Sequence, residues 1–170
     1  TARQVRDLLA LLEGEAAGLP ADEQARSVRS LQDRAASAAD SGQVATAYGI
    51  GMLGLNAARR ERASADAQAK AGAAGVTGAV RWLDDWVRRL SAGNAAAWTV
   101  AAQRGTGMGY EQQLAMPQVL SWLAHNDAIL RSVQDVLDGG GLDASAVDRC
   151  ARILADVDTA IDVSFPDQLG

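Results

Sequence analysis

The chain has 170 residues, of which 48% are hydrophobic and only 4% aromatic, and its formal net charge is −5. This length is sufficient for one domain with a hydrophobic core. The acidic balance excludes a nucleic-acid-binding protein that is basic throughout, although it is compatible with a local basic patch. Alanine supplies much of the hydrophobic content and β-branched runs are scarce, so the composition predicts an all-α protein.

The cysteine content and the length of the apolar runs further restrict the class of protein that the sequence can encode. The single cysteine, Cys150, excludes an internal disulfide. The longest apolar run, residues 44–55, is too short and too glycine-rich to span a bilayer, so no membrane partner is expected. A charged amphipathic helix begins at Thr1, so no signal peptide is expected. All basic residues except Lys70 are arginines, which fits GC-rich coding as well as phosphate binding.

Three helices are expected in the first part of the chain. Apolar residues at helical spacing predict a helix over about residues 2–17. A second helix is expected to begin at Pro20 and to end before Gly42, and a third to run from Val44 into the arginines at 59–62. Residues 63–78 begin helix-compatible and end glycine-rich, so their second half is predicted to be a mobile loop.

The remaining helices are predicted from similar signals. A fourth helix covers about residues 80–103, with a kink near Gly93. A short helix is expected over 110–115, a further helix from Pro117 to about residue 138, and a last helix capped by Asp143, with Phe165 opening a C-terminal tail. We therefore expect a single domain: an up-down four-helix bundle over about 2–104, followed by a helical extension over about 110–163.

Residue types that carry enzyme chemistry are scarce. His125 is the one histidine, so the sequence has no Cys/His metal set and no Glu-x-x-His pair for a di-iron site. The glycine-rich segment 105–109 follows a predicted helix rather than a strand, which favours a turn over a nucleotide-binding loop. We therefore predict no enzymatic activity, no catalytic residues, no cofactor and no metal.

Charged residues gather on both sides of the segment 63–78. Before it stand Arg59, Arg60 and Arg62, and after it stand Arg81, Asp84 and Asp85. If the segment closes a helical hairpin, these side chains face each other at one end and form a place to bind a phosphate backbone.

The alternative for these charges is local pairing along each helix. At i,i+4 spacing, Asp84 reaches Arg88, Asp85 reaches Arg89 and Arg62 reaches Asp66, and each exposed pair contributes about 0.3–0.5 kcal/mol. The neighbouring residues Trp82 and Trp86 are expected to be packing residues rather than platforms on which bases stack.

Four segments resemble, in order, the coat proteins of rod-shaped plant RNA viruses, the tobamovirus type. They are Gln24-Ala25-Arg26 at the start of the second helix, Leu53-Gly54 ahead of the cluster that contains Arg59, Arg81-x-Leu83-Asp84-Asp85, and Arg104-Gly105-Thr106-Gly107. The resemblance covers about residues 20–122. It does not include the outer β-structured region of that family or the residues beyond Trp122.

Members of that family are acidic, histidine-poor four-helix bundles that assemble helically around single-stranded RNA. The resemblance implies that Arg59, with Arg60 or Arg62, neutralises phosphates and that Arg26 makes a second phosphate contact. It places Asp85 beside the ribose. Arg81 and Asp84 belong to the same expected RNA-binding surface.

The leading hypothesis is therefore a structural coat protein that self-assembles helically and binds RNA, located in a virion or the host cytoplasm. Its subunits are expected to associate through the small residues Ala47, Gly49 and Gly51 and the Trp82/Trp86 face. The alternative is a bacterial or phage all-helical protein–protein interaction module, cytoplasmic and without nucleic-acid binding. A third hypothesis is a small-molecule-binding bundle or enzyme with His125 at its site.

Overall fold

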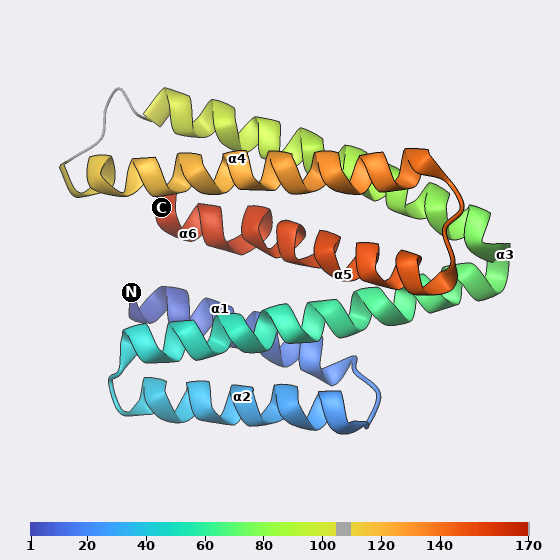
Figure 1. Cartoon of the computed structure of the whole chain (residues 1–170). Helices are drawn as coiled ribbons and strands as arrows, with labels where there is room; N and C mark the ends of the chain where they lie inside the picture. Colours follow the sequence, from blue (N-terminus) through green and yellow to red (C-terminus); the bar gives the residue numbers. More distant parts are fainter. Residues whose placement is uncertain (105–109, 170) are drawn as a thin grey trace. The chain divides into compact units, whose positions relative to one another are not determined.

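A computed structural model describes residues 1–104 and 110–169, with side chains at all of these positions except 110–115 and 169. Its elements are α1 (Ala2–Ala17), α2 (Glu23–Asp40), α3 (Val44–Arg104), α4 (Tyr110–Gly139), α5 (Ala144–Thr159), the π-helix η1 (Ala160–Ser164) and α6 (Phe165–Leu169) (Figure 1). The described residues contain helices and no strand, which confirms the predicted all-α class. No helix among them is long and apolar enough to cross a membrane.

The chain divides into two compact units, a first unit of Thr1–Asp66 and a second unit of Ala67–Gly170. The division falls within α3, and so within the stretch 2–104 that the sequence assigns to one four-helix core. Each unit is built around packed helices of its own.

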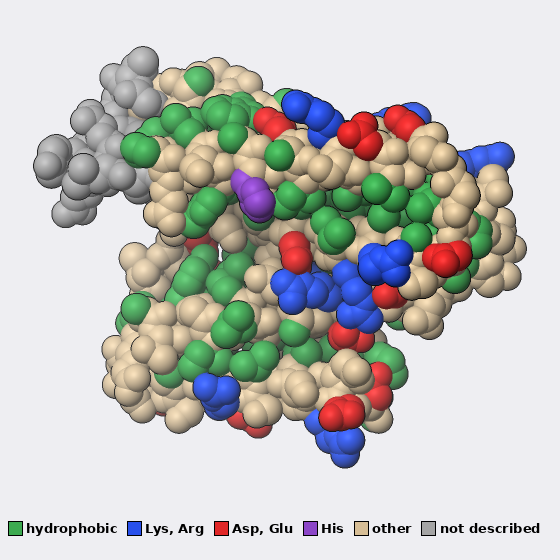
Figure 2. Space-filling view, in the orientation of Figure 1, with side chains coloured by type: hydrophobic (Ala, Val, Ile, Leu, Met, Phe, Trp, Pro, Cys, Tyr) green, Lys and Arg blue, Asp and Glu red, His purple; other side chains and the backbone are tan. Residues whose placement is uncertain are grey.

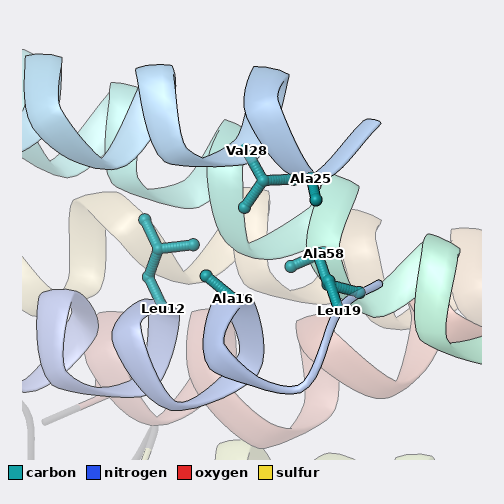
Figure 3. Packing of buried hydrophobic residues seen from close by; sticks show 6 residues of the cluster. All are labelled: Leu12, Ala16, Leu19, Ala25, Val28 and Ala58. Atoms are coloured by element: carbon teal, nitrogen blue, oxygen red, sulfur yellow. The ribbon is translucent and has the colours of Figure 1, made fainter. Parts of the chain in front are cut away.

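The first unit combines α1, α2 and the beginning of α3. Thr1 caps α1 in a capping box with Gln4, and Asp22 caps α2 by accepting a hydrogen bond from the backbone N–H of Ala25 at 2.9 Å. The cap at Asp22 makes α2 begin at Glu23, three residues after the predicted start at Pro20. The three helices meet in a hydrophobic cluster of Leu12, Ala16, Leu19, Ala25, Val28 and Ala58 (Figure 3).

Glycines of α3 allow α1 to approach closely. A Cβ atom at Gly51 would lie 2.9 Å from Leu8 Cδ2, and a Cβ atom at Gly54 would lie 3.0 Å from Leu12 Cδ2. Ala47 is also fully buried. The small residues Ala47 and Gly51, expected in a subunit interface, are therefore covered within the chain, and only Gly49 of that predicted stripe is exposed.

The expected loop in the second half of residues 63–78 is wrong. α3 is helical on both sides of Gly75, and Gly75 alone departs from helical geometry, with φ 70° and ψ 177°. Alanine predominates before this break and has the highest helix propensity, which offsets the cost of glycine. The positive φ is one that glycine adopts without steric penalty. The helix also continues through Gly93, where a kink was expected.

The second unit packs α4 beside the C-terminal part of α3 and beside the rod formed by α5, η1 and α6 (Figure 1). One cluster joins all three, with Ala101 from α3, Val119 and Leu123 from α4, and Phe165 from α6. Phe165 is 2% exposed, so the predicted tail is instead a helical end anchored in the core. Residues 110–139 form one helix with Pro117 inside it, rather than two helices.

Candidate functional site

Two members of the arginine cluster bind one carboxylate of the first unit. Arg62 Nη1 donates to Glu15 Oε2 at 2.8 Å, and Arg59 Nε lies 3.5 Å from Glu15 Oε1. The side chains of Glu15 and Arg59 are only 17% and 15% exposed, whereas that of Arg62 is 66% exposed. The hydrogen bond and charge of Glu15 raise the pKa of Arg62. The Glu15 carboxylate therefore balances one of the three positive charges of the cluster within the chain.

The other predicted phosphate ligands of this unit, Arg26 on α2 and Arg60 on α3, are exposed. Arg60 lies beside Arg59 in the chain but faces outward, while Arg59 is partly buried against α1. Acidic and basic side chains alternate over the surface drawn in Figure 2.

The remaining predicted site residues, Arg81, Asp84 and Asp85, belong to the second unit. Asp84 pairs with Arg88, as the local-pairing alternative predicts, and it also accepts a hydrogen bond from Gln134 Nε2 at 3.0 Å. Gln134 lies 50 positions away on α4, which sequence spacing could not indicate. Arg81 and Asp85 are exposed. In this unit the predicted RNA ligand Asp84 thus joins α3 to α4.

Trp82 and Trp86 of α3 pack as a pair. Their ring centroids are 5.4 Å apart with an interplanar angle of 38°. Trp86 is buried, and its indole N–H donates to Asp158 Oδ2 on α5 at 3.1 Å. This confirms the prediction of a packing role for Trp86 and places its polar edge at the wall of a surface pocket.

That pocket, here called the acidic pocket, lies between α3 and the rod formed by α5, η1 and α6. Its volume is about 440 Å³, and it is lined by Trp86, Arg89, Leu90, Gly93, Asp158, Ile161, Asp162 and Pro166. Two carboxylates and one guanidinium give the lining a formal charge of −1 (−2 + 1). Leucine, isoleucine, proline and the tryptophan ring supply an apolar floor.

A second pocket, here called the aromatic pocket, lies between α4 and the same rod. Its volume is about 320 Å³, and it is lined by Trp122, His125, Asn126, Ile129, Asp156, Val157, Ala160, Ser164 and Phe165. The rings of Trp122 and Phe165 stack with centroids 6.3 Å apart. The single histidine of the chain, exposed and coloured purple in Figure 2, thus lies at a pocket, as the third hypothesis requires.

The π-helix η1 contributes to both pockets. It supplies Ile161 and Asp162 to the acidic pocket and Ala160 and Ser164 to the aromatic pocket. A π-helical turn inserts one residue into an α-helix and shifts the residues after it to a new face, and such turns are frequent at functional sites. The shift also places Phe165 in the core.

Buried amides connect α3 to α4 near the aromatic pocket. Asn94 Nδ2 donates to the carbonyl oxygen of Leu123 at 3.0 Å and to Asp127 Oδ1 at 2.7 Å, and Trp98 Nε1 donates to Asp127 Oδ2 at 2.9 Å. Asn126 in turn donates to Asn94 Oδ1 at 3.3 Å. Fully satisfied buried networks of this kind fix the register of neighbouring helices. They therefore hold α4, which carries His125, in a defined position.

Gly105, Thr106 and Gly107 of the motif that begins at Arg104 lie outside the described residues. Among the described residues, no group of three His, Cys, Asp or Glu side chains is arranged to hold a metal ion. Sequence reasoning did not identify Asp158, at the end of α5, or Asp162, in η1. Their i,i+4 spacing could have indicated two carboxylates on one side of a helix.

Comparisons with known proteins give no relative. No family model, no curated protein and no solved structure matches this chain. The two pockets and the arginine cluster are therefore the features on which a function can be argued.

Proposed function

We propose that this chain is a non-enzymatic, all-helical protein–protein interaction module whose acidic pocket binds a basic side chain of a partner polypeptide. The observation that carries the proposal is the combination of Asp158 and Asp162 with an apolar floor in a pocket of about 440 Å³. A volume in this range is typical of ligand-binding pockets and holds one long side chain.

The lining suits a guanidinium or ammonium group at the end of an aliphatic stem. The stem packs on Leu90, Ile161 and Pro166, while the cation approaches the carboxylates. A guanidinium is planar and forms paired hydrogen bonds with carboxylates, so arginine fits better than lysine. An ionised carboxylate has about four acceptor positions, so the bond from Trp86 to Asp158 leaves capacity for a ligand.

Long-range charge favours the same class of partner. The chain carries a net charge of −5, which attracts basic polypeptides and repels polyanions. Arg89 in the same lining repels a second cation, so the pocket selects one basic side chain rather than a run of them.

The proposal is tested with a short acetylated and amidated Gly/Ser peptide that has one central arginine. The matched peptide carries citrulline, which has nearly the same shape without the charge. Because charged hydrogen bonds contribute about 1.5–3 kcal/mol, Asp162→Asn is expected to weaken binding of the arginine peptide about tenfold or more. The control Asp135→Asn changes an exposed carboxylate of α4 outside the pocket and is expected to have no effect. Equal affinity for the two peptides contradicts the proposal.

RNA coating is the second candidate, favoured by the exposure of Arg26, Arg60 and Arg62 in the first unit. For RNA to bind there, phosphates must compete with Glu15 for Arg62. Glu15→Gln is therefore expected to strengthen RNA binding if this candidate is correct, and replacing Arg59, Arg60 and Arg62 by alanine to abolish it. Filter binding of single-stranded RNA over a salt series measures both effects, because phosphate contacts make affinity fall steeply with salt. Electron microscopy for rods or discs tests the associated self-assembly.

A further inference from the structure

The aromatic pocket has a chemistry different from that of the acidic pocket. Its walls come from α4, α5, η1 and α6, and they combine aromatic rings with hydrogen-bonding groups. Trp122 and Phe165 provide ring surfaces, and Ile129, Val157 and Ala160 complete an apolar lining.

The size of the pocket restricts what it holds. A dry apolar cavity of about 150 Å³ is sufficient to bind benzene. The aromatic pocket, at about 320 Å³, therefore accommodates a fused two-ring system, and it is near the lower limit for drug-sized ligands. A large cofactor or an extended peptide would exceed it.

The pocket combines one group that only accepts, the Asp156 carboxylate, with His125, Asn126 and Ser164, which both donate and accept. Asp156 has a carboxylate, and Ser164 has a hydroxyl oxygen. Asn126 donates from its amide nitrogen to Asn94 Oδ1 at 3.3 Å. Asn126 is 5% exposed, and its position is set by the buried amides between α3 and α4. A ligand with a flat apolar body and a donor directed to the Asp156 carboxylate fits this lining.

We propose that the aromatic pocket binds a planar heteroaromatic ring with a ring N–H, of the size of indole, with the ring against Trp122 and the N–H directed to the Asp156 carboxylate. Aromatic rings favour offset or edge-to-face packing against one another, and this packing adds to the gain from burial. A carboxylate has about four acceptor positions, so Asp156 accepts the ligand N–H in addition to the interaction that it makes within the chain. This site is separate from the acidic pocket, so its test is independent of the proposed function.

The experiment compares indole with benzofuran, which has nearly the same shape but an oxygen in place of the N–H. Binding to the full chain is measured by calorimetry, with ligand-observed NMR for weak affinities. Indole is expected to bind at least fivefold more tightly than benzofuran. Asp156→Asn keeps the size of the side chain and removes its charge, so it is expected to bring the ratio of the two affinities close to one.

A second variant tests the location. Ala160→Leu places a larger side chain in the pocket and is expected to abolish binding of both ligands, whereas the control Ala128→Leu, on the exposed face of α4, leaves binding unchanged. Circular dichroism confirms that each variant is folded, and if Ala160→Leu unfolds, the Asp156→Asn comparison decides alone. Equal binding of indole and benzofuran by the unmodified chain overturns the proposal. Unchanged indole binding by folded Ala160→Leu overturns it as well.

Discussion

The Arg62 guanidinium donates a hydrogen bond to the Glu15 carboxylate at 2.8 Å, across 47 positions of the sequence. Arg59 approaches the other oxygen of the same carboxylate at 3.5 Å. One acidic side chain of α1 therefore anchors two turns of α3 by charge. The cluster that the sequence presents as a phosphate-binding patch is, in part, an internal contact between helices.

Glu15→Gln is expected to lower the free energy of unfolding by about 1–2 kcal/mol, because Arg59 would keep its charge in a largely buried position with a weaker partner. Chemical denaturation followed by circular dichroism measures the change. Glu13→Gln removes an exposed carboxylate of the same helix and serves as the control. Equal stability of the two variants would show that the contacts of Glu15 with the arginines stabilise the fold no more than the hydration of an exposed carboxylate does.

Gly51→Leu is expected to destabilise the first unit by about 1–3 kcal/mol or more, because even a Cβ atom there would lie 2.9 Å from Leu8 Cδ2. Gly49→Ala, two residues away, meets no atom within 4 Å and is expected to stabilise α3 by about 0.5–1 kcal/mol. Denaturation midpoints test both. A Gly51→Leu variant that is as stable as the unmodified chain would contradict the packing of Gly51 against Leu8. It would favour the hypothesis that Gly51 lies in an interface between subunits.

Gly75→Ala and Gly72→Ala are expected to change the melting temperature in opposite directions. Gly75 has φ 70° and ψ 177°, a region adopted almost only by glycine, where a side chain costs about 1–3 kcal/mol, whereas Gly72 is an exposed helical position with open space around it. Alanine at 72 gains helix propensity of up to about 1 kcal/mol. Differential scanning calorimetry measures the melting temperature of each variant. A higher melting temperature for both variants would mean that α3 is an unbroken helix.

Cys150 is expected to react slowly with Ellman's reagent until the chain unfolds. The thiol is buried, and burial raises its pKa while Arg149 partly opposes the shift. Because the folded state retains the thiol proton to higher pH than the unfolded state, the free energy of unfolding falls as pH rises past the ordinary pKa of a thiol. Cys150→Ala is expected to lack this component. Fast labelling of the native chain would contradict the burial of Cys150.

The sequence predicted the features that local rules determine. The cap residue Asp143 and the spacing of Val147, Cys150 and Leu154 predicted α5 and its buried face correctly. The contact between Asp84 and Arg88 was predicted as well, because an i,i+4 pair depends on one helix alone.

Features that depend on tertiary packing were not predictable in the same way. Phe165 follows the π-helix η1 and stacks on Trp122, which stands 43 positions earlier in the chain. Neither feature is visible in the local sequence, so the end of the chain looked like a tail. Gly75 looked like part of a longer loop, because the sequence does not show that this single residue is enough to interrupt the helix α3. The pockets join α3 or α4 to residues near the C-terminus, and no spacing rule connects such distant positions.

The indole N–H signal of Trp86 tests the proposed function most directly, because this group donates to Asp158 at the wall of the acidic pocket. In a proton–nitrogen NMR spectrum the signal is assigned with Trp86→Phe, and the arginine and citrulline peptides are then titrated in turn. The account predicts a saturable shift of the Trp86 signal with the arginine peptide, little change with citrulline, and loss of the shift in Asp162→Asn. An unmoved Trp86 signal at saturating arginine peptide, or the same shift with citrulline, would contradict the claim that this pocket binds a basic side chain.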